Sequence, residues 1–245
     1  KILKILANKD ALYNADGNVN VTSNLNVLGA ITPFFGEYGI SRNPESFASQ
    51  AYTCYWTDKA RGVVLRLSGS NITPISDHGL KDWFSDNLRD AGVGSKLIGT
   101  YDTKKESYNI SLTRTTGIPE TTVSFGEKTN GWTSFKSFIP ESGLSLNGNY
   151  YTFKGGDIWR HHSNIVNRAS FYGSPMFSSY IDVLFNQLPG VVKNFGSLNY
   201  EGSQAKITLN TTDGEYYNNT PSAGWFVHNG NTDLEESSQL EFKNK

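Results

Sequence analysis

The chain has 245 residues, and its 22 Lys and Arg side chains nearly balance its 23 Asp and Glu side chains, which gives a formal net charge of −1. This balance excludes a global attraction to nucleic acid or anionic lipid, although it leaves a local contact with DNA open. A single cysteine, Cys54, excludes an internal disulfide, and no run reaches the ~18–20 apolar residues of a membrane span.

The residue types favour β structure. Aromatic residues make up 13% of the chain, and 24 glycines are spread among clusters of Asn, Ser and Thr. Aromatic and β-branched side chains fit a pleated surface, whereas Gly and Asn supply the turns between strands. We therefore expect an all-β protein.

The first half of the chain is expected to contain a hairpin, a loop and two further strands. The first thirty residues predict a hairpin with its turn at Asp16 and Gly17, since Asp-Gly is a strong hairpin signal. Residues 31–49 contain Pro and Gly at several positions and are expected to form a loop. Strands are then expected at residues 51–56 and 63–67.

One segment departs from the β pattern and predicts a short amphipathic helix near residues 78–90. Its apolar side chains recur at the spacing of one helix face, at Leu80, Trp83, Phe84 and Leu88. Asp77 is the expected N-cap, and Gly92 is the expected stop.

The rest of the chain predicts antiparallel meanders joined by short Gly and Asn turns. Strands are expected at residues 96–101, 107–112, 121–125, 132–138, 144–146, 150–153, 158–161, 180–185, 191–200, 206–209 and 224–227. Trp132, Phe135 and Trp159 are expected to be mostly buried. Strand pairs at this spacing favour a β-propeller-like fold, and a β-sandwich is the alternative.

The domain organisation is expected to be simple. Residues 1–245 predict a single β-rich segment, with residues 92–96 as the place where it would divide. Because the chain begins with Lys1 and its only methionine is Met176, we expect it to be a piece or a processed product of a longer protein.

No pattern in the sequence predicts catalysis, a cofactor or a metal site. His161 and His162 are adjacent, so on a strand they would point to opposite faces, and no metal-ligand spacing links them to His78 or His228. The acidic turn at residues 14–20 lacks the register of a calcium loop. Acids that would be needed for glycosidase chemistry have no partner in the sequence; they are Asp102, Asp157, Asp182 and Glu201. The polar pairs at residues 104–106 and 127–128 are expected to be solvated turns.

Several long blocks resemble a structural virion protein of large tailed phages, a group that includes crAss-like and marine contractile-tailed phages. The blocks are residues 37–48, 58–68, 75–84, 99–102, 108–112, 125–140, 150–159, 183–186 and 193–203. The resemblance covers most of residues 12–230. It implies a tail or neck location in the virion and brings no catalytic residue with it.

The expected function is therefore structural: a tail-associated virion component that acts through subunit–subunit contacts, with other tail proteins as partners and a homo-oligomeric ring as the assembly. The alternative is a glycan-binding module for the host surface. In that case aromatic side chains would line an open groove, with Trp132, Tyr150, Tyr151 and Trp159 as the candidates.

Overall fold

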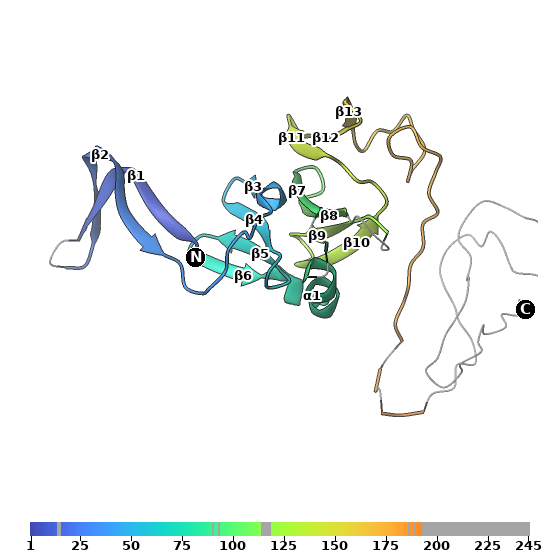
Figure 1. The fold of residues 1–245 in the computed structure, drawn as a ribbon, viewed down its shortest axis with the longest axis horizontal. Helices are drawn as coiled ribbons and strands as arrows, with labels where there is room; N and C mark the ends of the chain where they lie inside the picture. Colours follow the sequence, from blue (N-terminus) through green and yellow to red (C-terminus); the bar gives the residue numbers. More distant parts are fainter. Residues whose placement is uncertain are drawn as a thin grey trace, which may run out of the picture. The chain divides into compact units, whose positions relative to one another are not determined.

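The computed structural model describes residues 1–13, 16–89, 91–92, 94–113, 119–185, 187–188 and 190–192 (Figure 1). These residues form four antiparallel sheets and one short α helix, which confirms the predicted all-β class with antiparallel meanders. The strands are β1 (Leu3–Tyr13), β2 (Val19–Pro33), β3 (Ala48–Gln50), β4 (Thr53–Asp58), β5 (Val63–Ser68), β6 (Asn71–Pro74), β7 (Lys96–Asp102), β8 (Ser107–Thr113), β9 (Thr121–Gly126), β10 (Gly131–Lys136), β11 (Ser142–Leu146), β12 (Asn149–Lys154) and β13 (Asp157–Arg160). The helices are α1 (Lys81–Arg89) and the 3-10 turns η1 (Pro44–Ser46) and η2 (Ile75–Asp77).

The chain divides into two compact units, residues 1–181 and 182–245, and most of the second lies outside the described residues. The single-segment organisation stays a prediction. None of the described helices has the length and apolar character that a bilayer crossing needs.

The predicted hairpin at the start of the chain is confirmed. Strands β1 and β2 pair antiparallel as a two-stranded sheet, with register shifts between Ile5 and Lys9. Gly17 lies in the turn with a φ of 78°, a conformation that glycine adopts without the steric cost other residues meet.

Two four-stranded sheets, β3–β4–β5–β6 and β7–β8–β9–β10, contribute most of the core of the first unit. Each is a meander in which consecutive strands are neighbours. A stack of tyrosine rings joins the two sheets, because Tyr55 of β4 lies 4.8 Å from Tyr108 of β8 and 5.6 Å from Tyr101 of β7 between ring centroids. Tyr55 and Tyr108 are fully buried, and the Tyr108 hydroxyl donates to the carbonyl oxygen of Ser46 at 2.7 Å.

Helix α1 confirms the predicted amphipathic helix. Phe84 and Leu88 are buried in the core, and Leu80 and Trp83 pack partly buried against it. The predicted N-cap, Asp77, is wrong. Asp77 ends the 3-10 turn η2, and the first helical backbone bond runs from the N–H of Phe84 to the carbonyl of Leu80. Helix α1 ends at Arg89, and Gly92 instead accepts the N–H of Ser95 in the turn that follows.

The β11–β12–β13 sheet presents two different faces. In its register Gly143, Thr152 and Trp159 lie opposite one another, and Ser145 lies opposite Tyr150. This inner face contains the fully buried Thr152 and Tyr150. Alternate residues form the opposite side, here called the outer face: Ser142, Leu144, Leu146, Asn149, Tyr151, Phe153, Ile158 and Arg160.

Two expectations about the second half of the chain are wrong. Residues 180–185 do not form a strand in the described structure. Phe135 is not buried, since its side chain is 51% exposed, and Trp132 and Trp159 are only partly buried. The strands expected at residues 206–209 and 224–227, and most of 191–200, lie outside the described residues.

Candidate functional site

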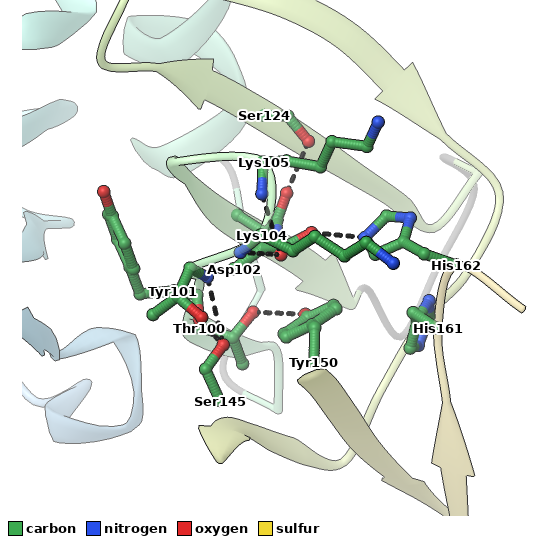
Figure 2. Close-up of polar contacts among 12 residues, drawn as sticks. Thr100, Tyr101, Asp102, Lys104, Lys105, Ser124, Ser145, Tyr150, His161 and His162 are labelled. Atoms are coloured by element: carbon green, nitrogen blue, oxygen red, sulfur yellow. Dashed lines mark hydrogen bonds and ion pairs between the residues drawn. The ribbon is translucent and has the colours of Figure 1, made fainter. Parts of the chain in front are cut away.

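The Asp102 carboxylate is the centre of a polar junction between two sheets (Figure 2). Asp102 ends β7 and is only 1% exposed, so its charge requires hydrogen-bond partners. Its Oδ1 accepts the backbone N–H groups of Lys104 at 3.0 Å and Lys105 at 3.2 Å, which closes the β7–β8 turn. Its Oδ2 lies 2.6 Å from Nε2 of His162, which follows β13. One carboxylate therefore fixes a tight turn and binds a segment 60 residues later in the chain.

Two further contacts hold the β11–β12–β13 sheet against β7. The Ser145 hydroxyl donates to the carbonyl of Tyr101 at 2.8 Å and accepts the N–H of Thr103 at 3.1 Å. The hydroxyls of Thr100 and Tyr150 lie 2.7 Å apart (Figure 2). These contacts satisfy buried polar groups that would otherwise destabilise the packing of the two sheets.

His161 occupies a different environment from His162, although the two residues are adjacent. Its ring lies 4.7 Å from Phe138 and 4.8 Å from Tyr150, and its Nε2 is 2.7 Å from the Thr152 hydroxyl. Burial, together with repulsion from His162 when that ring is protonated, lowers the pKa of His161 to about 4. His161 is therefore neutral at neutral pH.

This junction has the geometry of a structural connection. The Thr152 hydroxyl beside His161 is fully buried, so no substrate can reach it without unpacking the sheet. In the described ranges no group of three or more His, Cys, Asp or Glu side chains could hold a metal ion. Of the other acids considered from sequence, Asp157 is exposed at the start of β13, Asp182 lies in the second unit and Glu201 lies outside the described residues.

A second polar connection links the β3–β6 and β7–β10 sheets through Glu127. The guanidinium of Arg66 on β5 binds it with two bonds, Nε to Oε1 at 2.8 Å and a terminal nitrogen to Oε2 at 2.7 Å. The Tyr55 hydroxyl also donates to Oε1. Burial alone would raise the pKa of Glu127, but the bonds from Arg66 and Tyr55 outweigh it and lower that pKa below its usual value. Residues 127–128 lie in the predicted turn, but the Glu127 carboxylate binds Arg66 and Tyr55, so the prediction that it is solvated is wrong.

The four aromatic residues proposed for glycan binding do not form one groove. Tyr150 is buried on the inner face, Tyr151 lies on the outer face, and Trp159 packs against Tyr172 at 5.6 Å. Trp132 instead packs on Phe84 of helix α1 at 4.5 Å, and its indole N–H donates to the Ile75 carbonyl at 2.9 Å. Trp132 is only partly buried and lines a hollow of about 200 Å³, together with His78, Gly79, Leu80, Thr133, Ser134 and Phe135.

Comparison with known proteins gives one family match. A family model described as Crassvirus muzzle protein matches residues 34–156, half of the chain. The matched region runs from the end of the β1–β2 hairpin through β12, and therefore includes both four-stranded sheets, helix α1 and Asp102. No curated protein matches the chain.

Proposed function

The chain belongs to the Crassvirus muzzle protein family and is a structural component of a phage virion, and from this premise we propose that it acts in the phage tail through contacts between subunits. The family is the one that the sequence resembles, and its description agrees with the predicted location in the virion. The finer proposal is that identical copies form a closed ring and contact other tail proteins.

The observation that carries this proposal is the apolar surface of the β1–β2 hairpin. Large apolar side chains on both strands are exposed, namely Leu3, Ile5, Val27, Leu28 and Ile31. An isolated two-stranded hairpin is at best marginally stable in water, and contiguous exposed apolar surface marks an interaction site. A neighbouring subunit that covers the hairpin would resolve both problems.

The mass of the chain in solution tests this proposal. We expect light scattering during size-exclusion chromatography to give a discrete multiple of the 27.1 kDa chain, since repeated head-to-tail contacts close into rings. Val27→Asp should shift this equilibrium toward the monomer. A monomer at every concentration, together with the absence of the chain from rings in reconstructed virions, would overturn the proposal.

We also propose that the chain is not an enzyme and that its sheets are propeller-like. The chemistry-bearing side chains around Asp102 and Glu127 are used in contacts between sheets. Both four-stranded sheets are consecutive meanders, the form of a propeller blade. A reconstruction of the assembled particle tests the propeller, because its blades must surround a common axis.

Glycan binding remains the second candidate function, and the hollow beside Trp132 is the observation that favours it. Sugar rings stack on accessible aromatic side chains, and Trp132, Phe135 and His78 line this hollow together. Titration of host envelope polysaccharide against tryptophan fluorescence tests it, with Trp132→Phe as the variant that should lose the signal. An unchanged spectrum at saturating polysaccharide would exclude this candidate.

A further inference from the structure

The outer face of the β11–β12–β13 sheet is an apolar surface without a partner in the described part of the chain. Leu144 and Leu146 on β11 are 42% and 65% exposed and Ile158 on β13 is 67% exposed, with Tyr151 and Phe153 of β12 between the two strands. Sheets of this kind normally bury one apolar face and solvate the other. Here the inner face is already buried against β7. The outer face, which would then be expected to be polar, instead carries apolar side chains of the kind that are usually buried.

The segment at residues 174–181, here called the arm, also presents apolar side chains that the described part of the chain leaves exposed. Its sequence, Ser-Pro-Met-Phe-Ser-Ser-Tyr-Ile, has no charged residue, and residues 180–181 begin a stretch whose composition predicts a strand. It nevertheless forms no ladder with the described residues. Met176, Tyr180 and Ile181 are 66%, 78% and 71% exposed. The arm thus presents apolar side chains that its own sheets do not cover.

We propose that the arm of one copy packs on the outer face of the β11–β12–β13 sheet of a neighbouring copy. The inference rests on the proposed assembly of identical copies, and it identifies the contact. One chain supplies both surfaces, so a head-to-tail contact repeats from copy to copy and can close a ring. The arm has no charged residue and the outer face has one, Arg160 on the edge strand β13, so burial of apolar area is the main source of affinity.

The anchoring of the arm argues against its packing on its own sheet. The Tyr172 hydroxyl lies 3.0 Å from that of Thr152, and the Tyr172 ring packs on Trp159, so the chain approaches on the inner face. The N–H of Phe177 then donates to the carbonyl of Ala169 at 2.9 Å. Only four residues follow from there to Ile181, and they span at most about 14 Å. The outer face of its own sheet lies on the side away from this anchor, so the short reach of the arm favours the outer face of another copy.

A matched pair of substitutions tests the contribution of the arm. Tyr180→Asp in the full chain should raise the dissociation constant of the assembly by at least about tenfold, since a charge in an apolar contact is costly. Tyr52→Asp is the control, because Tyr52 is 91% exposed in the β3–β4 turn and lies outside both surfaces. Equal effects of the two substitutions on an assembly that forms would overturn the inference.

Cross-linking identifies the surface that the arm contacts. With Cys54→Ser as background, copies carrying Leu146→Cys are mixed with copies carrying Tyr180→Cys and treated with a short bismaleimide. We expect a cross-linked dimer, and no dimer when Tyr52→Cys replaces Leu146→Cys.

Three other outcomes would overturn the inference. If the chain assembles but the arm cross-links no more than the Tyr52 control, the proposed arm contact is wrong, and the proposed function still stands. A cross-link formed only within a chain that carries both Leu146→Cys and Tyr180→Cys would show that the arm closes on its own sheet. A chain that stays monomeric at all concentrations would remove the proposed function as well.

Discussion

At the scale of single residues, a few polar side chains connect the sheets of the first unit. Asp102 joins the β7–β8 turn to His162, and Arg66 joins β5 to Glu127. These pairs are separated by 60 and 61 residues in the chain. Sequence spacing identifies pairs along one helix or across one turn, so it gave no signal for these two. An Asp at the start of a polar turn, as at Asp102, was the only usable clue.

Asp102→Asn should lower the free energy of unfolding by about 1–3 kcal/mol, the range for a charge-assisted hydrogen bond to a buried group. Asparagine keeps an oxygen that can accept from Lys104 and Lys105, so the substitution reports mainly on the contact with His162. Urea unfolding followed by tryptophan fluorescence measures the change. The exposed Asp157 gives the control, and Asp157→Asn should change stability by less than about 0.5 kcal/mol. Equal losses for both variants would contradict the role of Asp102.

His161 should make folding stability depend on pH. Its pKa of about 4 in the folded chain lies below its ordinary value of 6.5, so between these values the unfolded chain binds a proton that the folded chain excludes. Stability should therefore fall as the pH drops from 6.5 toward 4. His161→Gln should flatten the part of this slope above pH 5. Unfolding midpoints at half-unit pH steps measure it, and an unchanged slope in His161→Gln would refute the assignment.

At the scale of elements, the sequence predicted most of the strands and missed how they meet. The strand pairs from β7 to β13 follow from runs of aromatic and β-branched residues with Gly and Asn turns, such as Asn147-Gly148. The apolar face predicts the helix, but the predicted start is wrong, because Asp77 belongs to the 3-10 turn η2 and helix α1 begins only at Lys81. Residues 180–185 have strand composition but form no strand in the described structure, and a single sequence cannot reveal whether such a run pairs.

Gly99 shows how closely two elements approach. A Cβ added there would lie 1.9 Å from the carbonyl oxygen of Ser46 in η1, a distance that requires the backbone to move. We expect Gly99→Ala to destabilise the fold by about 2 kcal/mol or more, as overpacking does. Gly131→Ala is the matched control, since its nearest contact would be an ordinary 3.7 Å. Thermal unfolding compares the two variants, and similar melting temperatures would show that η1 and β7 can separate at no cost.

At the scale of the whole molecule, the first unit combines a packed centre with apolar elements that the described chain leaves uncovered. The packed centre and the family match both lie largely within residues 34–156, whereas the β1–β2 hairpin and the arm flank that range. The sequence alone predicted a structural role and a virion location through its resemblance. It did not show which surfaces lack a partner, because exposure depends on the three-dimensional packing of every other segment.

The hairpin should behave differently in the isolated chain and in the virion. A two-stranded sheet opens easily on its own, so the amides of β1 and β2 should exchange with deuterium quickly in dilute, dissociated chain. If a neighbouring subunit covers Leu3, Ile5 and Leu28, the same amides should exchange at least about tenfold more slowly in assembled particles. Strands β8 and β9 are the internal reference, because the buried Ile110 and Val123 protect them in both states. Hydrogen exchange read by mass spectrometry gives both rates, and hairpin amides that exchange equally fast in particles would show that no subunit covers this surface.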